Sequence, residues 1–120
     1  MLPARFALAA LLAASLPASA QTAPRRIAYL GIAPSESVRV CMNDVRAGLQ
    51  KAGWSVGDQV VLEWTDAGND PARLAPLAQA IVASRPDVLI TTEDLPNTAL
   101  MNATRQLPIV VMGATNLNQV

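Results

Sequence analysis

Histidine is absent from this chain of 120 residues, and cysteine is represented only by Cys41. Without imidazole, the sequence lacks the commonest general base, the usual metal ligand and the residue on which Ser-His-Asp catalysis depends. A single cysteine excludes an internal disulfide and a thiolate metal cluster, and its place beside an apolar helical face favours a packing role. The glycines match neither a G-x-G-x-x-G turn nor a phosphate-binding loop. The sequence therefore predicts no catalytic residues, no metal and no cofactor.

An excess of charge of one sign is also lacking. Nine basic and nine acidic residues give a formal net charge of zero, and only 3% of the residues are aromatic. Proteins that bind nucleic acid usually carry a basic patch, aromatic residues that stack on bases, or both. We expect no nucleic-acid partner.

The beginning of the chain has the three parts of an export signal. Met1–Arg5 is short and basic, Phe6–Leu16 is apolar except for Ser15, and Pro17–Ala20 supplies the small residues that precede a cleavage site. The apolar segment is shorter than the ~20 residues that a membrane-spanning helix needs. These features predict a signal peptide over residues 1–20 that is cleaved after Ala20, and hence a periplasmic protein.

After a flexible lead-in over residues 21–25, strand-like runs alternate with amphipathic helical patterns. The strand-like runs are 26–32, 59–65, 88–92 and 108–112. The intervening helices are predicted from a cap at Ser35 or Ser37 to Gly53, from a cap at Asp70 with Pro71 next, and from Pro96 to about Gln106. This alternation predicts an α/β fold with a doubly wound parallel sheet, because right-handed crossovers place such strands parallel.

The loops at the carboxyl ends of the strands are the expected binding positions. In open α/β sheets, ligands bind at this edge, near the switch in strand order. Trp54 is predicted at the opposite edge, and Gly31 fits a ligand cleft and an ordinary strand end equally well. The candidate ligand-binding residues, from the loops after the first, third and fourth strands, are Ala33, Ser35, Glu36, Thr92, Glu93, Asp94, Gly113, Ala114 and Thr115.

The order of several motifs is similar to that of a known family. The chain reads RIAYLGI, then DVRAGLQKAGWSVGDQVVLEWTDAGNDPARLAPLAQAIVASRPDVLITT, then NATRQLPIVVMGAT. This order resembles the periplasmic substrate-binding components of ABC transporters, in the branch that resembles binders of tryptophan and other aromatic amino acids. The resemblance covers nearly all of residues 26–120.

The resemblance implies two α/β lobes that close over a small, amino-acid-like metabolite and present it to an ABC permease in the membrane. Residues 26–120 match only part of the first, N-terminal lobe, so the lobe is expected to be incomplete. The alternative is a truncated lobe that binds no metabolite and self-associates through an open sheet edge at Ile109–Val111, since unpaired edges favour association.

One stretch departs from the family pattern. Where relatives usually have small Gly, Ser or Thr residues after the third strand, this chain has Thr92, Glu93 and Asp94 before Leu95 and Pro96. Two carboxylates there would disfavour an anionic ligand group and favour an ammonium group. The same residues would also suit the start of a helix, where acidic side chains are stabilising. Both interpretations remain open from the sequence.

Overall fold

The computed structural model describes residues 23–112. The predicted signal peptide, the first residues of the lead-in and the candidates Gly113, Ala114 and Thr115 lie outside the described residues. The elements follow the predicted alternation. They are β1 (Arg25–Gly31), α2 (Glu36–Lys51), β2 (Val60–Asp66), the 3-10 helix η1 (Pro71–Arg73), α3 (Leu74–Ala83), β3 (Val88–Thr91), α4 (Asp94–Ala103) and β4 (Ile109–Val111).

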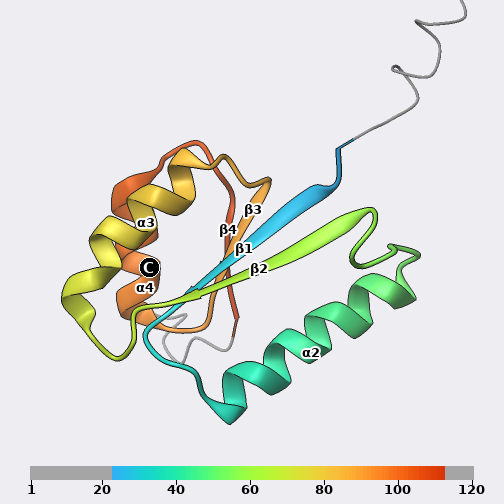
Figure 1. The fold of residues 1–120 in the computed structure, drawn as a ribbon, viewed down its shortest axis with the longest axis horizontal. Helices are drawn as coiled ribbons and strands as arrows, with labels where there is room; N and C mark the ends of the chain where they lie inside the picture. Colours follow the sequence, from blue (N-terminus) through green and yellow to red (C-terminus); the bar gives the residue numbers. More distant parts are fainter. Residues whose placement is uncertain (1–22, 113–120) are drawn as a thin grey trace, which may run out of the picture.

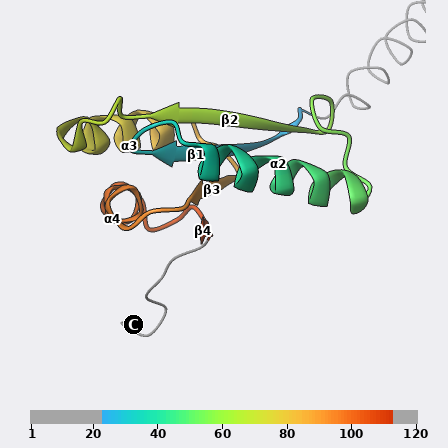
Figure 2. The ribbon, with the colours of Figure 1, turned by 90° about the horizontal axis from the view of Figure 1, so that it is seen from below.

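The four strands form one parallel sheet in the order β2-β1-β3-β4, which Figure 2 shows from top to bottom. The connection through α2 leads from β1 outward to β2, whereas the connection through α3 leads back across β1 to β3. The direction of winding therefore reverses between β1 and β3. The predicted doubly wound α/β fold is confirmed, and this reversal defines its switch point.

Helices cover both faces of the sheet, with α2 on one side and α3 and α4 on the other (Figure 1). Successive residues of a strand point to opposite faces, so the central strand β1 supplies both cores. Ala28 and Leu30 pack with the α3 and α4 side, while Tyr29 packs with Val38 and Met42 of α2.

Capping residues set the helix boundaries. The Ser35 hydroxyl accepts a hydrogen bond from the Val38 N–H at 3.1 Å, so Ser35 is the N-cap of α2. Gly53 follows the helix with φ of 96°, a conformation that glycine adopts without strain. Asp70 caps η1, which precedes α3, rather than capping α3 directly.

The third predicted helix was placed too late. Helix α4 begins at Asp94 and ends at Ala103, two residues before Pro96 and three before Gln106. Proline is compatible with the first helical turn, where an N–H has no partner within the helix, so Pro96 does not have to begin the helix. Thr104 ends it by adopting an extended conformation, and its hydroxyl accepts hydrogen bonds from the N–H groups of the next turn.

Arg26 joins three elements near the amino edge of the sheet. Its Nε donates to Glu63 Oε1 of β2 at 2.5 Å, and its Nη1 donates to the carbonyl oxygen of Ser84, after α3, at 2.6 Å. The cation also lies where the negative end of the α3 dipole favours it. The hydrogen bond from Arg26 holds the pKa of Glu63 below its ordinary value.

Replacing Glu63 with Gln should therefore remove part of the pH dependence of stability. Because the pKa of the folded carboxyl is lowered, its stabilising contribution is present above the unfolded pKa and is lost as the pH falls through the folded pKa. The side chain is 38% exposed, so solvent screening limits the difference at neutral pH to about 1 kcal/mol or less. Urea unfolding at neutral and acidic pH should show the two proteins converging on acidification. A difference that stays constant with pH would assign the effect to packing.

Candidate functional site

A cavity of about 350 Å³ lies at the carboxyl edge of the sheet, beside the switch point. One wall comes from the start of α2, which follows β1, and the other comes from the loop that follows β3. Met112, after β4, completes the lining. The lining residues are Ser35, Ser37, Val38, Cys41, Thr92, Glu93 and Met112.

The α2 wall combines hydroxyl groups with an apolar surface. Ser35 and Ser37 lie at the helix start, and Val38 and Cys41 follow at the i, i+3 spacing that places two residues on one helical face. Val38 is buried, and Cys41 is a free thiol that is partly exposed. This wall offers two hydroxyls beside a small apolar surface.

The β3 wall is polar. The Thr92 hydroxyl forms a hydrogen bond with the hydroxyl of Tyr29 at 3.3 Å. Glu93 occupies the N-cap position of α4, and its N–H donates to Thr91 Oγ1 at 3.4 Å. Its Oε2 is buried, and no hydrogen-bond donor contacts that oxygen within residues 23–112.

Tyr29 connects this wall to the core. Its ring is buried and packs edge-on against Trp64, with the ring centroids 5.2 Å apart. The ring lies beside Gly31, the next residue on the same face of β1, so this glycine makes room for an aromatic side chain. Burial raises the pKa of the Tyr29 phenol, and the charge of Glu93 adds to the increase. The phenol therefore remains neutral and keeps its hydrogen bond to Thr92.

The structure brings some of the predicted site residues together and separates others. Ser35, Thr92 and Glu93 line the cavity. Ala33 lies in the connection between β1 and α2 and does not line the cavity. Glu36 and Asp94 are exposed in the first turns of their helices, and Glu36 forms an ion pair with Arg39.

Sequence reasoning missed four lining residues, which are Ser37, Val38, Cys41 and Met112. The helical spacing from Ser35 could have indicated the three residues of α2, because their side chains follow the capping residue on one face. No local sequence pattern could have indicated Met112, because it follows β4 and belongs to no helix. It reaches the cavity because β4 pairs with β3 in the strand order.

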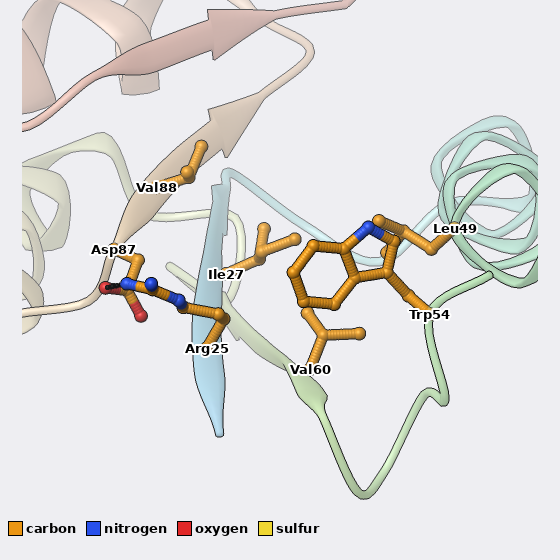
Figure 3. Close-up of a pocket in the computed structure, with 7 residues that line it drawn as sticks. All are labelled: Arg25, Ile27, Leu49, Trp54, Val60, Asp87 and Val88. Atoms are coloured by element: carbon orange, nitrogen blue, oxygen red, sulfur yellow. Dashed lines mark hydrogen bonds and ion pairs between the residues drawn. The ribbon is translucent and has the colours of Figure 1, made fainter. Parts of the chain in front are cut away.

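A second cavity, of about 330 Å³, lies at the amino edge, between the end of α2 and the sheet (Figure 3). Trp54 lies over it beside Leu49 and Val60, which places Trp54 at the edge opposite the expected cleft, as predicted. The charged groups in its lining are Arg25 and Asp87, which form an ion pair at 3.5 Å. This cavity presents an apolar surface without an unpaired charged group, unlike the cavity at the carboxyl edge.

Residues 23–112 contain no group of three or more His, Cys, Asp or Glu side chains arranged to hold a metal ion. In the same range, no helix is both long enough and apolar enough to cross a membrane.

The chain belongs to the ABC transporter substrate-binding protein family. The family model matches residues 26–118, which include the whole sheet except Arg25, the first residue of β1, and both walls of the carboxyl-edge cavity. Among curated proteins, no sequence matches this chain significantly.

Solved structures share the fold. A conserved domain protein from Vibrio cholerae O1 biovar El Tor is 25% identical with a TM-score of 0.69, over 74% of this chain and 30% of that one. An ABC domain from Streptococcus pneumoniae in complex with L-Trp is 21% identical with a TM-score of 0.67, over the same shares of 74% and 30%. The substrate-binding protein CD0873 of Clostridium difficile, which has adhesive properties, is 18% identical with a TM-score of 0.67, over 72% and 30%. The matched region thus spans less than a third of each of these structures.

Replacing Gly31 with Ala should destabilise the fold by about 1–3 kcal/mol, the usual cost of overpacking a core. An added Cβ would lie 2.5 Å from the hydroxyl oxygen of Tyr29 and 2.8 Å from its Cε1. The ring would have to move, which would weaken its contacts with Trp64 and Thr92. Urea unfolding followed by tryptophan fluorescence measures the loss.

Gly48→Ala is the matched control, because Gly48 lies in α2 and a Cβ there would meet no atom within 4 Å. This variant should be stabilised by about 0.5–1 kcal/mol, since alanine is the better helix former. Equal stability of Gly31→Ala and the wild type would show that Gly31 is not needed to seat the Tyr29 ring.

Proposed function

We propose that this chain is part of the solute-binding component of an ABC-type import system, and that it binds a small, amino-acid-like metabolite without transforming it. The observation that carries the proposal is the carboxyl-edge cavity at the switch point between β1 and β3, in a chain of the substrate-binding family. That is where open α/β sheets hold their ligands. The L-Trp complex of the Streptococcus pneumoniae protein supports an amino-acid-like ligand.

The cavity lining suits a small molecule with polar and apolar parts. The hydroxyls of Ser35, Ser37 and Thr92 can each donate or accept a hydrogen bond. Val38 and Met112 offer apolar contacts beside them. A few converging polar groups on an apolar surface are typical of small-molecule sites. The lining supplies contacts for binding, and we expect no turnover.

The remaining parts of the mechanism extend beyond the described residues. We propose that a second lobe closes over the ligand and that the closed form delivers it to an ABC permease. The match to 30% of the solved structures leaves room for such a lobe in the complete protein. The N-terminal pattern, with cleavage after Ala20, supports export to the periplasm.

Adding the correct metabolite should raise the melting temperature of the full protein. A ligand at 100 times its Kd adds about 2.7 kcal/mol of stability. Differential scanning fluorimetry with a panel of amino acids and related metabolites measures this shift. Ser37→Trp should abolish the shift by filling the carboxyl-edge cavity, whereas Trp54→Ala, at the amino edge, should retain it. If only Trp54→Ala lost the ligand-dependent shift in melting temperature, the binding site would lie at the amino edge.

The alternative function, association through the sheet edge, has its own test. Strand β4 ends the strand order, and its Val110 is 45% exposed. If that edge pairs with a second copy, sedimentation velocity should show a dimer whose fraction rises with protein concentration, and Val110→Lys should disperse it. A monomer at all concentrations would reject edge pairing and would leave the solute-binding proposal unaffected.

A further inference from the structure

The Tyr29 hydroxyl is buried and has one partner among the described residues. Only 1% of Tyr29 is exposed. Its hydroxyl oxygen lies 3.3 Å from Thr92 Oγ1, and it makes no other hydrogen bond within residues 23–112. A buried phenol without a partner is costly, so the bond to Thr92 is what satisfies the polar end of this ring.

The surroundings of the two hydroxyls decide which of them donates. If Thr92 donated, the proton of the Tyr29 phenol would be buried without an acceptor, which is unfavourable. A phenol is also the stronger donor and the weaker acceptor of the pair, because its ring withdraws electron density from the oxygen. Thr92 is partly exposed and lines the carboxyl-edge cavity. The phenol therefore donates, and Thr92 Oγ1 accepts.

This direction leaves the proton of the Thr92 hydroxyl without an acceptor in the part of the chain that the structure describes. A hydroxyl has one proton to donate, and here its oxygen is already engaged. The Ser35 hydroxyl, on the opposite wall, is in the same state, because its oxygen accepts the Val38 N–H at 3.1 Å. Both walls of the cavity thus offer a hydroxyl that accepts from the protein and can donate to a bound molecule.

We propose that Tyr29 is a positioning residue of this site, which holds the Thr92 hydroxyl so that it donates its proton to an oxygen atom of the ligand. This inference rests on the proposed function, and it adds a residue that acts through another and the kind of ligand atom that is recognised. The Tyr29 ring is itself held by its edge-on contact with Trp64 and by the space at Gly31. A hydroxyl that is oriented before binding loses less entropy when the ligand arrives.

The test combines a change in the protein with a change in the ligand. L-tryptophan and L-tryptophanamide carry an acceptor oxygen that tryptamine lacks, and L-leucine, L-leucinamide and isopentylamine form a second series. Calorimetry on the full protein should show the oxygen-bearing compounds binding the wild type about tenfold more tightly than the amines. Thr92→Val, which keeps the shape and removes the hydroxyl, should abolish most of this difference. Tyr29→Phe, which keeps the ring, should bind the oxygen-bearing compounds about threefold more weakly and the amines unchanged.

A double variant and two further variants separate positioning from general damage. Tyr29→Phe combined with Thr92→Val should bind no more weakly than Thr92→Val alone, because the phenol acts only through Thr92. Thr92→Ser keeps a hydroxyl and should retain the preference for the oxygen-bearing compounds. Thr98→Val is the matched control, because it makes the same change on the exposed side of α4, where the hydroxyl donates to the Asp94 carbonyl oxygen at 3.0 Å. It should bind every compound like the wild type.

A Tyr29→Phe protein that binds like the wild type, or that weakens the amines and the oxygen-bearing compounds equally, would overturn this inference and leave the proposed function standing. If the wild type binds neither series but binds another metabolite of the panel, the same variants are compared with that metabolite, and equal affinities overturn the inference. If no compound binds the wild type, the proposed function fails and this inference fails with it.

Discussion

The parallel pairing of β1 with β3 is the constraint on which the site depends. It sets Tyr29 opposite Ile90 and aligns the carboxyl ends of the two strands. Because the chain leaves β1 toward α2 on one face and leaves β3 toward α4 on the other, the segments that follow these strands diverge. Side chains must fill the space between them or leave it open. Here it remains open as the carboxyl-edge cavity.

Tyr29 makes this cavity part of the folded core. A side chain of a central strand is ordinarily packed among apolar groups. Because Gly31 has no side chain, the Tyr29 ring extends along β1, and its hydroxyl reaches Thr92. The hydroxyl at the end of a buried ring needs a partner, and Thr92 provides it. The orientation of the cavity wall is therefore coupled to the packing of α2 against the sheet, through the contacts of Tyr29 with Val38 and Met42.

The cavities at the two edges of the sheet differ in the charged groups that line them. At the amino edge, Arg25 and Asp87 neutralise each other, and the remaining surface is apolar around Trp54. At the carboxyl edge, Glu93 is left without a cation among the described residues. The hydroxyls of Ser35, Ser37 and Thr92 line the same cavity, so its surface can exchange hydrogen bonds with a bound molecule. This contrast separates a gap in packing from a site suited to a polar ligand.

The sequence alone determined the alternation of strands and helices and the end of α2 before Gly53, and it restricted the N-cap of α2 to Ser35 or Ser37, because periodicity and capping act over a few residues. It also placed the candidate site at the carboxyl edge, since parallel strands align their ends. The start of α4 at Asp94 was not predicted from the sequence, because proline is compatible with any position of the first helical turn and Pro96 did not mark the first residue. Only the tertiary structure decided that Thr92 and Glu93 meet the α2 wall, that Met112 joins them, and that the Glu93 side chain is not a cap. Those outcomes depend on strand order and on long-range packing, which bring together residues that no local pattern connects.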